Sequence, residues 1–510
     1  MENSRIEISI SEICYYLFFG ILFFAKAIGL YDGQTVFKLC LLAAAGFAFI
    51  KAVLTEYDIR ELIGIIVLIA LGGLVYLNSG EKSALVFLVM MAGFKNISME
   101  RIMKIGLLIW SLGFGGMVLK SILHIGNETI MAHHKFGMDM LRGSFGYSHP
   151  NVLHISYAIL VVLLLFTVAN ESSTLKIYLW TLTGNVMVFL YSLSFTGFLL
   201  VLFFIAFHAY FTYRKHFSKL ERILIQCVFP ACVLFALFAP LLVAPDTPLF
   251  LFLNKALNRR FYASRLYLQE NPVTLFGSRI FASHTYALDS SYVTLLIYGG
   301  LILFLLVCAG YLYAIHVSLK KNDIKALSML LSFSIAGVIE PFLFNLSFKN
   351  LSLLIVAKCL FDLCGEGKKL RLLSGFDKKI GIGYKKVRAK AGWKTLVLAV
   401  ALALLTGGGF YLLKDMPEVI YVEERYCDLE EGNVLAIDEI EKPGKDGVVF
   451  YGYSDKATGF YKFEGKTISF EKTRDTLRLM FVIFLSVYLI FPFFLKKNQT
   501  KSLYKQGTKI

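Results

Sequence analysis

Long apolar runs separated by short polar loops fill the first 365 residues of the chain. Each run approaches the ~20 residues that an α-helix needs to cross a bilayer. A membrane β-barrel would instead alternate apolar and polar residues over ~10-residue strands. The pattern therefore predicts about a dozen membrane-spanning helices. The predicted spans are 11–30, 36–53, 61–77, 83–94, 103–122, 150–169, 175–192, 194–212, 222–243, 291–315, 326–345 and 349–364.

The composition agrees with a protein that lies mostly in lipid. Hydrophobic residues make up 57% of the chain and charged residues 17%, whereas a soluble domain has roughly 25% charged residues. The mean hydropathy is +0.65. Because backbone polar groups in lipid must find partners within the protein, continuous apolar runs favour helices. We therefore expect an all-α polytopic membrane protein with a core of about 12 helices.

The formal net charge of +16 sits largely in short loops. This distribution is typical of the cytoplasmic side of a membrane protein and does not indicate nucleic-acid binding. The basic loops fall at alternate turns if the short run 83–94 counts as a span. Both termini then face the cytoplasm, and two long polar loops, 123–149 and 244–290, lie outside. The first run is long and follows acidic residues, so we interpret it as a retained helix and not a cleaved signal.

The last third of the chain has a different organisation from the core at 1–365. Residues 366–393 form a basic linker, which we expect to lie on anionic lipid at the cytoplasmic face. Two further spans, 394–413 and 475–495, enclose an acidic segment at 415–472 with two strand-like stretches. Residues 394–510 are thus expected to form a transmembrane hairpin that carries a small β-rich external domain.

Arg142 stands in the first outer loop, shortly before His149, Pro150 and Asn151 at the start of the next span. The positive-inside rule leaves few arginines outside, so Arg142 requires an explanation. Contact with lipid head groups is one alternative, and an anionic ligand is the other. Proline is ordinary at the first helical position, and Asn151 or His149 could simply form hydrogen bonds at the membrane surface.

The second outer loop repeats this concentration of arginines. Its segment 249–268 mixes apolar and polar residues at helical spacing, which suggests an amphipathic helix at the membrane interface. Arg259 and Arg260 are adjacent, so their directions differ by ~100°, and we expect one to face a site and the other the lipid head groups. Arg265 follows Arg260 by five residues, so the two lie only approximately on the same helix face. Arg279 stands where the loop returns to the membrane.

Three titratable residues follow these arginines. His284 alone is more typical of a surface histidine than of a catalyst. Asp289 precedes the next span, where it could cap the helix and also accept a proton. Glu340 lies near the outer end of a late helix, where a structural partner for an arginine is the favoured role.

No spacing of histidine, cysteine or acidic residues completes a metal site. His133 and His134 are adjacent and lack further ligands. No nucleotide-binding fingerprint or Ser-His-Asp pattern is present. We therefore expect neither a metal nor a cofactor.

Four groups of segments follow one another along the membrane core: 142–146 with 149–151, 253–260 with 274–277, 289–292 with 298–302, and Glu340. Their order resembles the Wzy-type O-antigen and capsular polysaccharide polymerases and the related O-antigen ligases. One departure concerns the turn at 191–197, where the family commonly has Ser-Arg-Thr-Gly and this chain has Phe195 in place of arginine. If that arginine normally helps to hold the pyrophosphate, another group must replace it in this chain.

The resemblance implies transfer of a glycan from undecaprenyl pyrophosphate to a lipid-linked oligosaccharide repeat unit. The reaction would occur at the outer face of the bacterial cytoplasmic membrane, by a metal-independent, inverting mechanism. Asp289 would act as general base, with His284 as the alternative. The arginines that would bind the pyrophosphate are Arg142, Arg260, Arg265 and Arg279. Arg142 is also a catalytic candidate. The supporting residues would be Asn151, His149, Glu340 and Arg259.

Two other functions remain open at this stage. A ligase would move finished polymer to another acceptor, and the sequence does not separate it from a polymerase. A non-enzymatic flippase for the same lipid-linked sugar would place its arginines in a central cavity instead of outer loops. Partners would be the lipid-linked oligosaccharides, the bilayer and other polysaccharide export or chain-length proteins. The C-terminal module could set chain length or contact such proteins.

Overall fold

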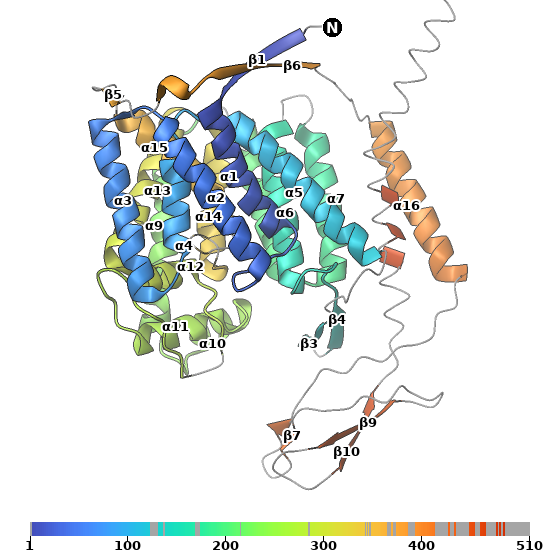
Figure 1. Ribbon diagram of the computed structural model, residues 1–510. Helices are drawn as coiled ribbons and strands as arrows, with labels where there is room; N and C mark the ends of the chain where they lie inside the picture. The colour runs from blue at the N-terminus through green and yellow to red at the C-terminus, as the bar shows by residue number, and fades with distance from the viewer. Residues whose placement is uncertain are drawn as a thin grey trace, which may run out of the picture. The chain divides into compact units, whose positions relative to one another are not determined.

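The computed structural model (Figure 1) defines most of the membrane core and short parts of the C-terminal region. The described residues are 3–122, 131–135, 138–168, 174–214, 216–283, 286–341, 343, 345, 348–364, 369–370, 374–385, 393–413, 427–428, 433–434, 448–453, 460–465, 476–477, 479–480 and 483–484.

The described chain is mainly helical, and a helix occurs within each of the twelve predicted core spans. The helices are α1 (Ile10–Ala27), α2 (Thr35–Leu54), α3 (Ile59–Ser79), α4 (Ser83–Ala92), α5 (Met99–Ile122), α6 (Pro150–Val168), α7 (Thr174–Ser192), α8 (Phe195–Tyr213), α9 (Lys219–Leu242), α10 (Pro248–Ala256), α11 (Arg260–Glu270), α12 (Ser291–Thr294), the π-helical η1 (Leu295–Gly299), α13 (Gly300–Lys320), α14 (Ile324–Ile339), α15 (Ser352–Cys364), the 3₁₀ turn η2 (Ser374–Phe376) and α16 (Trp393–Leu413).

Within the described residues, eight helical stretches are long and apolar enough to cross a membrane. They are α1, α2, α3, α5, α6, α8, α9 and the continuous stretch α12–η1–α13. This finding confirms a helical membrane protein, whereas the count of about 12 spans stays a prediction. Helix α4 has 10 residues and is only about 15 Å long.

Among the described residues, five strand pairs accompany the helices, and all five are antiparallel. The strands β9 and β10 coincide with the two strand-like stretches of the acidic segment, whereas the predicted external domain at 415–472 lies mostly outside the described residues and stays a prediction. The strands are β1 (Asn3–Ser9) with β6 (Lys379–Lys385), β2 (Tyr57–Asp58) with β5 (Lys369–Leu370), β3 (Met131–Lys135) with β4 (Met138–Arg142), β7 (Cys427–Asp428) with β8 (Asn433–Val434), and β9 (Val448–Tyr453) with β10 (Phe460–Gly465).

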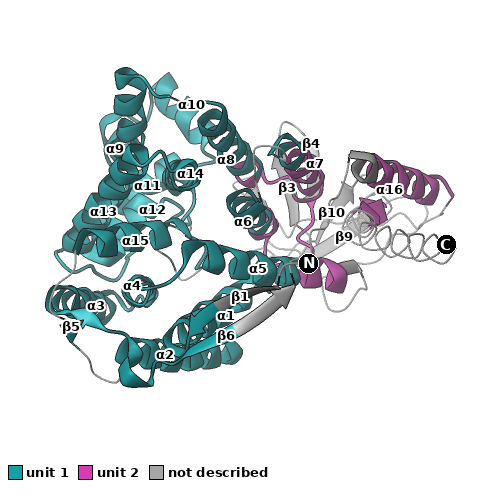
Figure 2. Cartoon of the chain, turned by 90° about the horizontal axis from the view of Figure 1, so that it is seen from above, with its two compact units in different colours: residues 1–114, 156–178, 198–386 teal, residues 115–155, 179–197, 387–510 magenta. Residues whose placement is uncertain are grey.

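The chain divides into two compact units, coloured separately in Figure 2. Unit 1 contains residues 1–114, 156–178 and 198–386. Unit 2 contains residues 115–155, 179–197 and 387–510. Helices α5 to α8 each contribute residues to both units.

Local capping signals set the limits of several helices in unit 1. Asp58 and Glu61 form a capping box at the start of α3, and Gly80 ends that helix in the left-handed conformation. Ser218 and Glu221 form a second capping box at the start of α9. Such side chains accept hydrogen bonds from the first backbone N–H groups, which lack partners within the helix.

One end of unit 1, here called the ribbon end, carries the β1–β6 and β2–β5 pairs (Figure 1). Strand β1 leads directly into α1, and Asp377 accepts hydrogen bonds from the backbone N–H and the hydroxyl of Ser11, both at 2.8 Å. The predicted basic linker is thus partly paired with the N-terminal segment, a contact that the sequence analysis did not anticipate.

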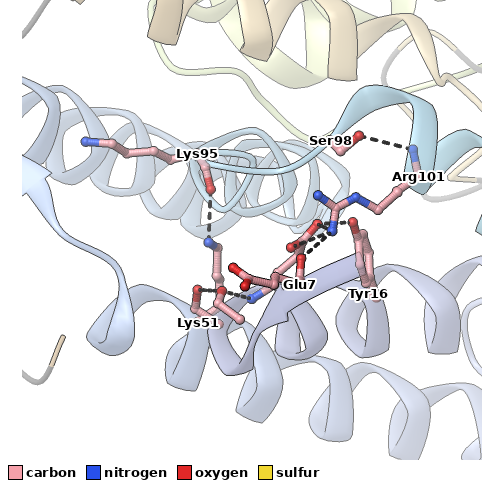
Figure 3. Close-up of polar contacts among 9 residues, drawn as sticks. Glu7, Tyr16, Lys51, Lys95, Ser98 and Arg101 are labelled. Atoms are coloured by element: carbon pink, nitrogen blue, oxygen red, sulfur yellow. Dashed lines mark hydrogen bonds and ion pairs between the residues drawn. The ribbon is translucent and has the colours of Figure 1, made fainter. Parts of the chain in front are cut away.

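Polar contacts at the ribbon end join α1, α2 and α5 (Figure 3). Arg101 donates to a Glu12 carboxylate oxygen at 3.0 Å and to the carbonyl of Glu7 at 3.3 Å. The buried Lys51 ammonium donates to the carbonyl of Lys95 at 2.9 Å, and Lys95 itself pairs with Glu61. Positive groups from the short loops therefore gather on one side of unit 1.

The opposite end of unit 1, here called the loop end, carries α10 and α11 (Figure 1). Lys82 pairs there with Asp32 at 3.0 Å, whereas Lys95 lies at the ribbon end. The segment with α4 therefore connects the two ends although the helix itself is short. The prediction that residues 244–290 lie opposite the basic loops is consistent with this arrangement, and the orientation in a membrane stays a prediction.

In unit 2, helix α16 packs against a segment of the second predicted hairpin span. Ala399 and Ala403 form a buried apolar cluster with Phe484. A Cβ atom at Gly407 would lie 2.1 Å from Met480, so only glycine permits this approach. The two segments of the predicted hairpin therefore contact each other.

Candidate functional site

A sharp turn between α10 and α11 positions the first arginine of the site. Asn258 and Arg259 both have left-handed backbone angles, with φ of 51° and 65°. The side chain of Asn254 accepts a hydrogen bond from the backbone N–H of Tyr262 at 3.1 Å, which fixes the turn. The predicted single helix over 249–268 was therefore wrong, because the chain reverses at 257–259.

This turn separates the two adjacent arginines. Arg260 begins α11 with a side chain that is only 11% exposed, whereas Arg259 is exposed to solvent or lipid. The expected divergence of the pair is confirmed, and Arg260 is the member that points inward.

The guanidinium group of Arg260 contacts two carboxylates. Its Nε donates to Asp289 Oδ2 at 2.8 Å, and its Nη2 donates to Glu340 Oε1 at 3.3 Å. The side chain of Asp289 is 28% exposed and that of Glu340 is 10% exposed. Arg260, Asp289 and Glu340 thus form one cluster at the loop end, although 80 positions separate the first residue from the last.

Ser291 fixes the backbone beside Glu340. Its hydroxyl donates to the carbonyl of Glu340 and accepts from the backbone N–H of Leu343, the latter at 3.0 Å. Helix α14 has ended at Ile339, so this hydroxyl holds the chain where it leaves the helix. Sequence reasoning noted Ser291 only as part of a motif.

Lys349 is a charged member of the site that sequence reasoning missed. It lies between α14 and α15 with 8% of its surface exposed. Lys349 and Glu340 are close enough to interact electrostatically, and Arg260 also acts on Glu340. A lysine between two apolar runs was the available signal.

Backbone hydrogen bonds join two of the predicted motifs, 274–277 and 298–302. The backbone N–H groups of Leu301 and Ile302 donate to the carbonyls of Thr274 and Leu275 at 2.9 and 3.2 Å. These donors are available because the helix widens into η1 and then breaks at Gly300. The outer loop thus closes onto the helix that begins after Asp289.

Two glycines permit the close approach of these two segments. A Cβ atom at Gly277 would lie 1.9 Å from the carbonyl oxygen of Tyr298, and one at Gly300 would lie 2.2 Å from the nitrogen of Gly277. Both residues also have positive φ angles, of 82° and 77°. Only glycine fits at these positions without a change in the backbone.

The other predicted residues of the large loop lie apart from the Arg260 cluster. Arg265 Nη1 donates to the carbonyls of Pro240, Leu241 and Val243 at 2.9 to 3.3 Å, and so caps the end of α9. Arg279 is exposed, and its Nε lies 4.0 Å from the Cβ position of Gly80. His284 lies outside the described residues.

Arg142 is held within unit 2 by the start of α6 and the end of α7. Its Nη2 donates to Asn151 Oδ1 at 2.5 Å, and its Nε donates to the carbonyl of Ser192 at 2.9 Å. His149 Nδ1 accepts from the backbone N–H of Asn151 at 3.0 Å. The structure therefore brings Arg142, Asn151 and His149 together, as their shared motif suggested.

His154 is a second residue that sequence reasoning missed. It is fully buried in α6, 2.8 Å from Asn185 Oδ1 and 3.1 Å from Ser192 Oγ. A Cβ atom at Gly197 would lie 2.5 Å from His154, so glycine permits this packing. A histidine inside an apolar run was the signal. Phe195 packs edge-on against Phe189, with ring centroids 5.0 Å apart.

The two arginine clusters could each bind an anion such as a phosphate, because guanidinium groups form paired hydrogen bonds with such oxygens. Within the described residues, no three histidine, cysteine or acidic side chains are grouped so as to hold a metal ion. No family model, no curated protein and no solved structure matches this chain.

Proposed function

We propose that this chain is a polysaccharide polymerase of the bacterial cytoplasmic membrane. It transfers a glycan from undecaprenyl pyrophosphate to a lipid-linked repeat unit at the outer face. The observation that carries the proposal is the contact of Arg260 with Asp289 and Glu340. A cation suited to a diphosphate and two carboxylates, of which one is accessible, share a site at the end of an apolar helical unit.

The chemical step breaks the bond between the anomeric carbon and the pyrophosphate oxygen. The acceptor hydroxyl attacks that carbon from the opposite side and loses its proton, so the configuration inverts. Negative charge develops on the departing pyrophosphate. Arg260 offsets this charge, and its partial burial strengthens the interaction because little water competes with it.

Asp289 is the general base in this proposal. It is more exposed than Glu340, so an acceptor hydroxyl can reach it. A diphosphate that binds Arg260 competes with Asp289 for the guanidinium group. Asp289 then loses its ion-pair partner and becomes a better proton acceptor. Glu340 and Ser291 hold the cluster in place during this exchange.

Arg142 is the second candidate for the diphosphate. Its guanidinium orientation is fixed by Asn151 and by the end of α7. The Arg265 contacts with the end of α9 suggest that this residue mainly supports the position of α11, on which Arg260 lies.

The test is glycan size analysis in cells that normally make this protein. Its gene is deleted, and the native protein or a variant is then supplied. We expect the native protein to restore a ladder of polymer lengths. Arg260→Lys should keep single repeats on lipid and reduce transfer by about 10²–10³-fold, because lysine lacks the forked donor geometry. Lys255→Ala, which removes an exposed charge from neighbouring α10, is the control and should keep the ladder.

Other outcomes would contradict the proposal. A normal ladder from well-expressed Arg260→Lys would remove this arginine from the chemistry. Loss of all lipid-linked sugar at the outer face in cells without the chain would indicate a flippase. Finished polymer that accumulates without its final acceptor would indicate a ligase.

A further inference from the structure

A cavity of about 140 Å³ lies at the loop end of unit 1, apart from the Arg260 contacts. Its apolar lining comes from α3, α4, η1 and α13. Its polar lining comes from Glu81 and Ser83 at the turn into α4, from Thr294 and Tyr298 on α12 and η1, and from Asn345. Since about 10–15 Å³ suffices for one water, the cavity could hold on the order of ten non-hydrogen atoms.

The position of the cavity links it to the proposed reaction site. Thr294 is the last residue of α12, whose first residue, Ser291, follows Asp289 by two positions. Its hydroxyl donates to the carbonyl of Ser290 at 2.7 Å. Asn345 belongs to the same segment between α14 and α15 as Glu340. The cavity and the Arg260 cluster therefore draw residues from the same two segments of the chain.

Two polar groups of the lining retain hydrogen-bonding capacity. Ser83 donates to Glu81 Oε2 at 2.7 Å, and among the described residues no group donates to Glu81 Oε1. The hydroxyl of Tyr298 makes no hydrogen bond to any described residue. Thr294 uses its proton toward Ser290 and can still accept. The cavity thus offers one strong acceptor, Glu81 in the turn before α4, and one free donor, Tyr298 on η1.

The lining does not favour a phosphate as the occupant, because its described residues include no lysine or arginine. A hydrocarbon chain would leave Glu81 and Tyr298 without partners, which costs free energy. A neutral ring with several hydroxyls matches both, since hydroxyls donate to a carboxylate and accept from a phenol. Arg279 lies beside Gly80, the residue before Glu81, so a phosphate next to such a ring would find a cation outside the cavity.

We propose that this cavity is a binding site for one neutral sugar ring of the lipid-linked substrate. The identity of the substrate rests on the proposed function, whereas sugar binding in the cavity can be tested without catalysis.

The experiment uses the full chain, purified in detergent. Two probes are prepared from cells in which the gene for this chain has been deleted. The probes are the lipid-linked repeat unit and the free oligosaccharide that mild acid releases from it. Binding is measured by native mass spectrometry. We expect Glu81→Gln and Tyr298→Phe each to weaken binding of the free oligosaccharide by about tenfold, the loss of roughly one hydrogen bond. Tyr31→Phe, at an exposed tyrosine of the loop end, should bind like the native chain.

Arg260→Ala separates this inference from the proposed function. It should abolish polymer formation and leave binding of the free oligosaccharide unchanged. Equal binding by the native chain and by both cavity variants, all with native thermal stability, would overturn the inference and leave the polymerase proposal intact. Binding of a free fatty acid with the same loss in both variants would identify a lipid site and also overturn it. Sugar binding that depends on the cavity in a chain that forms no polymer would support the inference and reject the proposed reaction.

Discussion

Arg259 and Arg260 are neighbours in sequence with opposite surroundings. Arg260 is paired with Asp289 and Glu340, and Arg259 is exposed. Their divergence was predicted, but the reason given, the ~100° between adjacent helical residues, was wrong, because Arg259 stands in a left-handed turn and α11 begins at Arg260. The carboxylate partners could not be assigned, because Glu340 is 80 positions away and such a pairing depends on the tertiary fold. Lys349 was missed for the same reason.

The charge of Glu340 should weaken diphosphate binding. Its carboxylate accepts a hydrogen bond from Arg260 Nη2 at 3.3 Å, so it competes with a diphosphate for the guanidinium group. Glu340→Gln removes this negative charge, so the affinity for undecaprenyl diphosphate should increase.

The measurement compares the affinities of the native chain and of Glu340→Gln for undecaprenyl diphosphate at one pH. The variant should bind up to about tenfold more tightly than the native chain. Equal or weaker binding by a variant of native thermal stability would contradict this role of Glu340.

The presence of a helix in each core span was the most predictable feature at the scale of elements, whereas helix limits differed by up to six residues, as at the end of α14, which was predicted at 345 and lies at Ile339. The run length and Pro150 placed the start of α6 at the residue where the structure has it. The reversal between α10 and α11 was not predictable from periodicity, because left-handed Asn258 and Arg259 interrupt a pattern that remains apolar on both sides. The closing of 274–278 onto η1 likewise depends on contacts between distant segments.

The stability of that closure should depend on Gly300. Its backbone angles, φ 77° and ψ 169°, belong to a region that glycine alone occupies readily, at a cost of about 1–3 kcal/mol for other residues. Gly300→Ala should therefore lower the unfolding temperature of the purified chain by several degrees.

Gly73→Ala is the matched control for this substitution. Gly73 lies inside α3 with no atom within 4 Å of its Cβ position, and alanine favours a helix by about 0.8–1 kcal/mol over glycine. The control should unfold at the native temperature or slightly above it. An unchanged unfolding temperature for Gly300→Ala would mean that the break after η1 adjusts to a side chain.

Within the molecule, unit 1 is joined at its ribbon end by segments from both ends of its own sequence. Ser11 and Asp377 are 366 positions apart and share two hydrogen bonds. The sequence indicated a basic linker over 366–393, because its charge is a local property. Both strands alternate isoleucines with other residues, and Ile6 pairs with Ile382 and Ile8 with Ile380. This alternation favours strands, but it does not specify a partner more than 360 positions away.

Asp377→Ala should destabilise unit 1 as a whole. The carboxylate accepts two hydrogen bonds at the start of α1, and hydrogen bonds to charged groups contribute about 1.5–3 kcal/mol. We expect a lower unfolding temperature and faster proteolysis of the N-terminal segment. Lys379→Ala is the control, because Lys379 pairs with Glu7 only at 3.6 Å and both side chains are about 70% exposed. Equal effects of the two substitutions would contradict a specific role for Asp377.

The β1–β6 pair also constrains the order in which the protein can be assembled during synthesis. The ribosome releases β1 first, yet the partner strand emerges only after α1 to α15. Until then, the N-terminal strand has exposed backbone donors and acceptors, which can pair with a wrong partner. Insertion of the early helices must therefore precede closure of the ribbon, and a chain that stops before Lys379 would remain in the membrane with its first strand unpaired and open to proteases.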